Sequence, residues 1–201
     1  MSDSLPIADQ GAADKAALRT ATLARRDAMP ADERQAAAAA IAARAFPVPV
    51  GGGTVVSGFF PMRSEINPLP LLRKLAAAGA QLALPVIAGR GKPLTMRAWN
   101  QGDDLASGQW GIREPTAQAR EVDPDVLIVP LACFDRAGHR IGYGAGYFDM
   151  TIRRLRGIKP VVAVGIAFAQ QEIDRVPANA HDEALDLVLT ERETIDLRRK
   201  A

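Results

Sequence analysis

Val126-Leu127-Ile128-Val129-Pro130-Leu131 is a short run of apolar residues with no polar position between them. A strand with one face in water alternates apolar and polar residues, so an uninterrupted run is typical of a strand covered on both faces. A second run of this kind spans 161–168, and another buried strand is expected at 54–60, after the glycines at 51–53. Shorter strands are expected at 81–87, 94–99 and 185–190. Continuous apolar strands favour a parallel sheet.

Helix-forming sequences lie at 12–28, 31–46, 69–78 and 147–155. The first is rich in Ala, Leu and Arg, which are strong helix formers, and Pro30 ends it. Asn67-Pro68 and Gly79 supply start and stop signals for the third. Strands followed by helices predict an α/β fold, a single three-layer domain with a mostly parallel open sheet between helices. Such sheets bind ligands at the carboxyl ends of their strands.

The composition is that of an ordinary packed domain, with 48% hydrophobic and 24% charged residues among 201. One domain is expected over 11–201, after an unstructured N-terminus at 1–10 that does not resemble a secretory signal. The 25 basic and 23 acidic side chains leave a formal charge of +2, too balanced for a protein that coats nucleic acid. No apolar run approaches the ~20 residues that span a bilayer. We therefore expect a cytoplasmic monomer that binds small molecules, with no nucleic-acid or membrane partner.

The most informative stretch is Gly138-His139-Arg140-Ile141-Gly142-Tyr143-Gly144-Ala145-Gly146-Tyr147-Phe148-Asp149, between an apolar strand and a predicted helix. Glycines at alternate positions leave backbone N–H groups uncovered, and a helix start after them makes an anion cradle. Arg140 adds a planar fork that suits phosphate oxygens. Asp149 falls in the first helical turn, where a carboxylate either favours the helix start or holds Mg²⁺ beside a triphosphate. The stretch predicts phosphate binding, with a plain glycine turn as the alternative.

A second candidate element is the acidic cluster of Asp182, Glu183 and Asp186, which precedes the last expected strand. Mg²⁺ takes one or two protein carboxylates and fills its other positions with waters and phosphate oxygens. The cluster is therefore a candidate metal site, and a solvated acidic loop is the alternative.

Together these two segments resemble the 5-formyltetrahydrofolate cyclo-ligase family, also called the methenyltetrahydrofolate synthetases. The glycine-rich run at 138–149 is similar to the central signature of that family, and 177–191 to its C-terminal signature. Phe60-Pro61-Met62-Arg63-Ser64-Glu65-Ile66 resembles its folate segment, and 15–19 its N-terminal basic element. The similarity runs in the same order from 15 to 191, so it covers nearly the whole chain.

The resemblance implies a role for each matching residue. The implied ATP contacts are Lys15, Ala16, Ala17, Leu18, Arg19, Arg140, Ile141, Gly142, Tyr143, Gly144, Ala145, Gly146 and Tyr147. The implied folate contacts are Phe60, Glu65, Trp110, Tyr143 and Tyr147. Glu65 would accept hydrogen bonds from the pterin, and Trp110 would stack on it. Asp149 and Asp182 would position Mg²⁺, and Arg140 and Asp149 would serve catalysis.

Helical periodicity adds one geometric expectation about the N-terminal element. At ~100° per residue, Lys15, Arg19, Thr22 and Arg26 fall on one stripe of a helix, so both basic groups of the element can face one ligand. A solvated basic helix face is the alternative for this stripe.

The reaction implied by the resemblance converts 5-formyltetrahydrofolate and ATP to 5,10-methenyltetrahydrofolate, ADP and phosphate, through a phosphorylated formyl group. It needs no nucleophilic serine, cysteine or histidine. This agrees with a sequence whose only histidines are His139 and His181 and whose only cysteine is Cys133, which is expected to be buried. A sugar-phosphate isomerase, a CoA-transferase-like enzyme and a non-catalytic nucleotide- or folate-binding module are the competing hypotheses. Nucleic-acid binding ranks last, because acids elsewhere offset the basic cluster of Arg153, Arg154 and Arg156.

Overall fold

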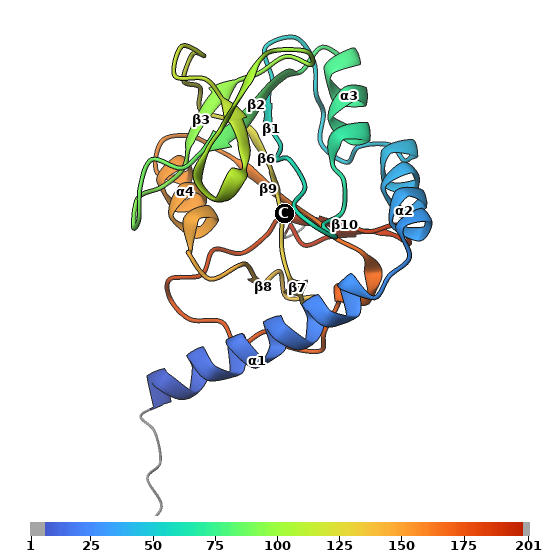
Figure 1. Ribbon diagram of the computed structural model, residues 1–201, viewed down its shortest axis with the longest axis vertical. Coiled ribbons are helices and arrows are strands. Elements are labelled where there is room, and N and C mark those ends of the chain that lie inside the picture. Colours follow the sequence, from blue (N-terminus) through green and yellow to red (C-terminus); the bar gives the residue numbers. More distant parts are fainter. Residues whose placement is uncertain (1–6, 199–201) are drawn as a thin grey trace, which may run out of the picture.

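The apolar runs of the sequence form a seven-stranded sheet in the order β11-β10-β9-β6-β1-β2-β3. The structure is a computed structural model that describes residues 7–198 (Figure 1). The five inner strands are parallel: β10 (Leu187–Leu189), β9 (Val162–Ile166), β6 (Val126–Val129), β1 (Val55–Ser57) and β2 (Gln81–Val86). The edge strands β11 (Thr194–Asp196) and β3 (Thr95–Ala98) are antiparallel to their neighbours. The predicted α/β fold with a mostly parallel sheet is confirmed.

The side chains of β6 alternate between two cores on opposite faces of the sheet. Val126 and Ile128 pack in the core that contains α2 (Ala31–Ala43) and α3 (Leu69–Ala77). Leu127 and Val129 pack in the core that contains α4 (Tyr147–Arg156). All four side chains are at most 1% exposed, which explains why the run has no polar position. The sheet therefore lies between helices, as expected.

Helix α1 (Ile7–Asp27) lies outside these layers. It contacts η2 (Ala169–Gln171), which follows β9, and β7 (Cys133–Phe134), which follows β6. Figure 1 shows α1 crossing below the sheet, at the end where these parallel strands finish. Residues 1–6 of the predicted unstructured segment lie outside the described residues, but the helix begins at Ile7, inside that segment. This end of a parallel sheet is where ligands bind.

The lone cysteine lies beneath α1. Cys133 is fully buried in a small cluster with Ile141 and Val176, against which Leu18 of α1 packs. Burial raises the pKa of the Cys133 thiol, and a hydrogen bond with Thr22 partly opposes this. The thiol is therefore a packed core group, as predicted.

Short strands account for the main differences from the sequence prediction. A hairpin of β4 (Leu105–Ser107) and β5 (Arg113–Pro115) lies between β3 and β6, where no strand was expected, and β7 pairs with β8 (Arg140–Ile141). These strands and β11 have two or three residues each, too few for a periodic pattern to reveal them. The second helix ends at Ala43 instead of 46, and Arg44 is already extended at φ −70° and ψ 156°.

In the part of the chain that the structure describes, no helix combines the length and the apolar character that a membrane span requires.

Leu155 of α4 tests the packing of that helix on the sheet. The side chain is fully buried, whereas Ile158, just beyond the helix, is 58% exposed. Leu155→Ala should lower the free energy of unfolding by about 2–5 kcal/mol, because it removes buried methyl groups and leaves a cavity. Ile158→Ala, the matched control, should change it by no more than about 0.5 kcal/mol. Urea unfolding followed by circular dichroism measures both, and similar losses in the two variants would contradict this packing.

Candidate active site

The glycine-rich loop connects β8 to the start of α4 at the carboxyl end of the sheet. Gly144 and Gly146 have φ of +102° and +67°, a left-handed conformation that side-chain-bearing residues rarely adopt. Gly146 is the N-cap of α4, and residues 143–146 are exposed. Exposed backbone before a helix start has the form of an anion cradle. Ile141, by contrast, is buried in the cluster beneath α1.

Helix α1 turns its basic stripe toward this loop. Arg19 Nε donates to the Gly142 carbonyl oxygen at 2.7 Å, and Lys15 Nζ lies 2.5 Å from Asp182 Oδ2. Thr22 and Arg26, further along the stripe, are 2% and 3% exposed. The prediction that these four residues share one face is confirmed, and that face contacts the protein rather than solvent.

The other predicted ATP contacts of α1 differ in how far they are exposed. Ala16 and Ala17 are exposed, whereas Leu18 is half-buried against the Cys133 cluster. The short side chains of the two alanines leave the helix surface beside Lys15 and Arg19 open.

Arg140 is buried and holds Asp149. Its side chain is 3% exposed, Nη2 donates to Asp149 Oδ1 at 2.8 Å, and Nη1 donates to the Glu183 carbonyl oxygen. Burial lowers the pKa of Arg140, and the Asp149 carboxylate opposes this shift. Because arginine stays charged in proteins, the buried cation needs this partner. In this structure the guanidinium therefore contacts Asp149 and Glu183, and phosphate contact by Arg140 stays a prediction.

The two predicted metal ligands, Asp149 and Asp182, belong to segments that contact each other. The Glu183 amide donates to Asp149 Oδ1 at 3.0 Å, so the peptide that follows Asp182 lies against Asp149. Among the described residues, no group of three or more His, Cys, Asp or Glu side chains forms a site that holds a metal. Mg²⁺ bound mainly by phosphate oxygens and water needs only one or two carboxylates, so Asp149 and Asp182 stay predicted ligands.

Glu65 lies in the turn at 62–65, next to Tyr143 of the glycine-rich loop. Its Oε2 accepts from the Met62 amide at 2.7 Å, and its carboxylate also accepts from the Tyr143 hydroxyl. Burial raises the pKa of Glu65, and the hydrogen bonds from Tyr143 and Met62 partly oppose it. Burial and the nearby Glu65 carboxylate raise the pKa of Tyr143. Glu65 is thus a half-buried acceptor next to the glycine-rich loop.

Three of the predicted folate-contacting aromatic residues come from separate elements. Trp110 lies between β4 and β5, is 64% exposed, and has its ring centroid 6.4 Å from that of Tyr147. Its φ of 59° is unusual for a side-chain-bearing residue. Phe60 packs edge-on against Trp99, with ring centroids 5.6 Å apart. The structure therefore brings Trp110 to Tyr147 at the start of α4, whereas Phe60 belongs partly to the core.

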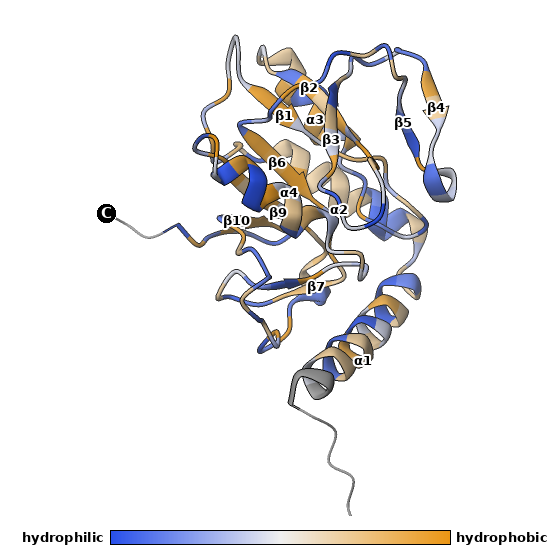
Figure 2. Cartoon of the chain, turned by 90° about the vertical axis from the view of Figure 1, so that its left-hand side faces the viewer, coloured by the Kyte–Doolittle hydropathy of each residue, from blue (hydrophilic) through white to orange (hydrophobic). Residues whose placement is uncertain are grey.

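Figure 2 shows the β4–β5 hairpin extending away from the sheet. A cavity of about 400 Å³ is lined by Phe60 and Trp99 together with Arg113 of β5 and Leu72 of α3. The Arg113 guanidinium carbon lies 5.5 Å from the centre of the Phe60 ring. The exposed side of Phe60 thus faces a hollow with both apolar and charged walls.

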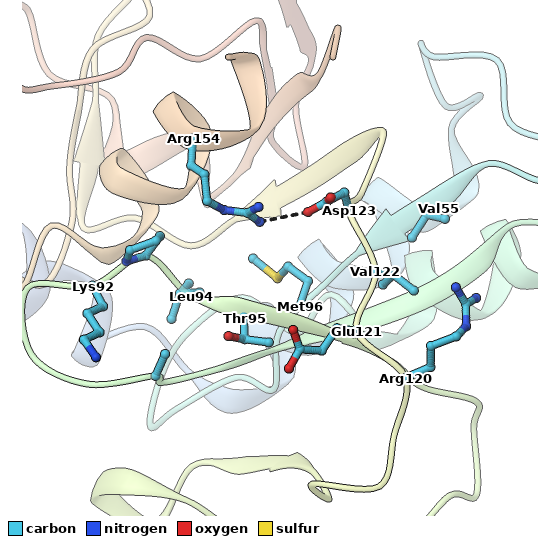
Figure 3. Close-up of a pocket in the computed structure, with 12 residues that line it drawn as sticks. Val55, Lys92, Leu94, Thr95, Met96, Arg120, Glu121, Val122, Asp123 and Arg154 are labelled. Carbon is cyan, nitrogen blue, oxygen red and sulfur yellow. Dashed lines mark hydrogen bonds and ion pairs between the residues drawn. The ribbon is translucent and has the colours of Figure 1, made fainter. Parts of the chain in front are cut away.

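A cavity of about 640 Å³ is lined by residues other than the predicted site residues. Met96, Val122, Asp123 and Arg154 are among the residues that line it (Figure 3). Arg154 Nη2 pairs with Asp123 Oδ1 at 2.9 Å. Arg154 lies two turns beyond Tyr147 on α4, so this cavity is separate from the start of the helix. We therefore place the candidate site at the glycine-rich loop, because of the chemistry of its residues, and not at this cavity.

The sequence prediction did not include the contacts that join these parts. Arg26 donates to Ser64 and to Tyr143, and the Glu183 backbone contacts both Arg140 and Asp149. The position of Arg26 on the basic stripe was the available signal.

Comparisons with known proteins identify the family of this chain. The family model of the 5-formyltetrahydrofolate cyclo-ligase family matches residues 11–191. A 5-formyltetrahydrofolate cyclo-ligase of Mycolicibacterium smegmatis is 33% identical over 189 residues, which cover 90% of this chain and 95% of the relative. One of Escherichia coli is 32% identical over 150 residues, which cover 71% of this chain and 80% of the relative.

A solved structure, of 5,10-methenyltetrahydrofolate synthetase from Aquifex aeolicus, is similar at a TM-score of 0.74 and 26% identity. The similarity covers 93% of this chain and 94% of that one. A family match over most of the chain, a relative of nearly equal length and a shared fold lead to one conclusion. The chain belongs to the 5-formyltetrahydrofolate cyclo-ligase family.

Proposed function

We propose that this protein converts 5-formyltetrahydrofolate to 5,10-methenyltetrahydrofolate, with ATP and Mg²⁺, and releases ADP and phosphate. Membership of the cyclo-ligase family supports an ATP-dependent ligase that acts on folate. The observation that carries the site assignment is the meeting of three elements: the basic face of α1, the glycine-rich loop and the acidic segment after it. Their meeting point is the carboxyl end of the sheet, where such folds bind ligands.

The proposed ATP site uses positive charge and backbone donors together. Arg19 lies beside the exposed loop, where a Cβ on Gly144 would come 3.8 Å from its guanidinium, and Lys15 pairs with Asp182 of the acidic segment. A triphosphate on the loop would therefore meet both side chains and the N–H groups that precede α4. Arg140 would act on the site through Asp149, because its hydrogen bond fixes the direction of that carboxylate. Mg²⁺ would be held by Asp149 and Asp182 and would neutralise phosphate charge.

The proposed folate site lies where the turn at 62–65 meets the glycine-rich loop. Glu65 is ready to accept hydrogen bonds from the N–H groups of a pterin, and Trp110 and Tyr147 offer aromatic faces for stacking. Phe60 would contribute its exposed edge. Tyr143 contacts Glu65 and belongs to the loop, so it is a neighbour of both proposed substrates.

The proposed chemistry needs alignment and charge neutralisation from the protein. The formyl oxygen attacks the γ-phosphorus and ADP leaves, which gives an iminium phosphate. N10 then adds to the activated carbon, and loss of phosphate and of the N10 proton leaves the methenyl bridge. Bringing the formyl oxygen and the γ-phosphate together supplies much of the rate enhancement, and positive groups around the phosphates supply the rest.

Asp149→Asn tests the proposed site directly. The amide can still accept from Arg140 but offers no negative charge to Mg²⁺ or to the buried guanidinium, so turnover should fall about 100-fold or more. Methenyl absorbance is followed after mixing the protein with 5-formyltetrahydrofolate, ATP and Mg²⁺. Asp174→Asn, which changes an exposed carboxylate, is the matched control and should keep full turnover. Wild-type turnover in Asp149→Asn, with its fold checked by circular dichroism, would remove Asp149 from the chemistry.

Metal removal tests the dependence on Mg²⁺. EDTA should stop both ADP release and methenyl formation, and excess Mg²⁺ should restore both. Without the cation, the negative charges of the phosphates and of the two carboxylates repel each other. Unchanged turnover in EDTA would contradict the magnesium requirement. A sugar-phosphate isomerase or a binding module would release no ADP under either condition.

The pH dependence of folate binding tests Glu65. Burial raises the pKa of this carboxyl above its usual value of 4.5, and Arg26 and Tyr143 partly oppose the shift. Protonation removes acceptor capacity, so the KM for 5-formyltetrahydrofolate should rise as the pH falls through this raised pKa. Glu65→Gln should have a higher KM at neutral pH and lose this dependence. Glu33→Gln, at an exposed position, should retain the wild-type profile, and an identical profile in Glu65→Gln would contradict the role of Glu65.

A further inference from the structure

A buried arginine lies between the two halves of the candidate site. Arg26, in the last turn of α1, is 3% exposed. Its Nε donates to Ser64 Oγ at 3.0 Å, and its Nη1 donates to Tyr143 Oη at 2.6 Å. Ser64 belongs to the turn at 62–65 and Tyr143 to the glycine-rich loop. One guanidinium therefore contacts both the proposed folate segment and the proposed ATP loop.

Each partner of Arg26 has a further hydrogen bond. The Ser64 hydroxyl donates to Asp27 Oδ1, and the Tyr143 hydroxyl donates to the Glu65 carboxylate. Asp27 Oδ1 also lies 3.8 Å from Arg26 Nη2, which offsets part of the buried charge. We call these five residues, Arg26, Asp27, Ser64, Glu65 and Tyr143, the Arg26 network. Through it, the direction of Glu65 and that of Tyr143 depend on the same cation.

The loop side of this network needs an anchor. Tyr143 is 46% exposed and stands between Gly142 and Gly144, whose backbone freedom would let its ring point in many directions. The Arg26 guanidinium carbon lies 5.8 Å from the centre of the Tyr143 ring, in addition to the hydrogen bond to its hydroxyl. The hydrogen bond and the cation–π contact together fix the ring at the junction of the two proposed substrates.

The turn side is held in an uncommon conformation. Arg63 has a φ of 54°, which is costly for a residue with a side chain and persists only where neighbouring contacts impose it. The Glu65 amide donates to the Met62 carbonyl at 3.0 Å, and the bond from Arg26 to Ser64 ties the turn to α1. The position of Glu65 thus depends on contacts at both ends of a strained segment.

We propose that Arg26 is a positioning residue that aligns Tyr143 and the Ser64–Glu65 turn for the reaction without contacting either substrate. The inference rests on the proposed function, because alignment matters only if the loop and the turn hold two substrates that react with each other. Arginine suits the role because its planar fork donates in two fixed directions at once, whereas a lysine ammonium is a single point charge on a flexible stem.

Arg26→Lys tests this inference, with Arg25→Lys as the matched control. Arg25 precedes Arg26 in the same turn and is exposed. Arg26→Lys should raise the KM for 5-formyltetrahydrofolate and lower kcat about tenfold or more, because small displacements between reacting groups are costly. Its affinity for ATP, titrated by calorimetry, should change less than its KM for 5-formyltetrahydrofolate, since Lys15 and Arg19 are intact and only Tyr143 loses its anchor. Arg25→Lys should match the wild type in all three measurements.

A double-mutant cycle separates positioning from a purely structural role. Tyr143→Phe removes the hydroxyl that Arg26 and Glu65 share, so adding Arg26→Lys to it should cost less in kcat/KM than in the wild type. Loss of folded protein alone would lower the active fraction and leave KM unchanged. Wild-type kcat and KM in Arg26→Lys, full additivity in the cycle, or a lowered rate with unchanged KM would each overturn the inference.

Ser64→Ala keeps the inference testable if Arg26→Lys does not fold. It removes one partner of the network without leaving a charge unpaired, and it should raise the KM for 5-formyltetrahydrofolate; an unchanged KM would overturn the inference. Failure of the proposed function itself has a different result, because the wild-type protein would then form no methenyl product with ATP.

Discussion

The buried charge of Arg140 is the constraint around which the carboxyl end of the sheet is organised. Arginine cannot lose its proton inside a protein, so its burial requires a partner. Asp149 supplies that partner from the first turn of α4, and the Glu183 carbonyl supplies a second acceptor. One side chain therefore links β8, α4 and the acidic segment. Helix α1 joins the same assembly through Lys15 and Asp182, so four parts of the chain converge at one point.

The fold could be predicted where burial is continuous along the sequence. The strands at 126–129 and 162–166 are apolar on both faces because two cores enclose them, and that pattern is visible without tertiary information. The strands β7, β8 and β11 were missed because each is held by a few pairings to its neighbour and not by its own composition. The place of α1 could not be predicted either, because a basic stripe does not say what faces it.

The candidate site could be predicted in parts but not as an assembly. Local spacing brought Lys15 and Arg19 onto one helix face and put Asp149 in the first turn of a helix, and the structure confirms both placements. The links between the parts join residues far apart in sequence. Arg26 reaches Ser64 across 38 positions and Tyr143 across 117, and no local pattern contains such distances. Helical periodicity therefore found Arg26 but not its partners.

The packing of Leu18 over Cys133 has a practical consequence. The chain has a single cysteine, and α1 helps to enclose its sulfur. A thiol reagent can reach that sulfur only when the covering segment lifts away, so the labelling rate reports how often this local opening occurs. The labelling rate of Cys133 in the natural sequence is thus a measure of how often the N-terminal helix undocks, and it needs no engineered label.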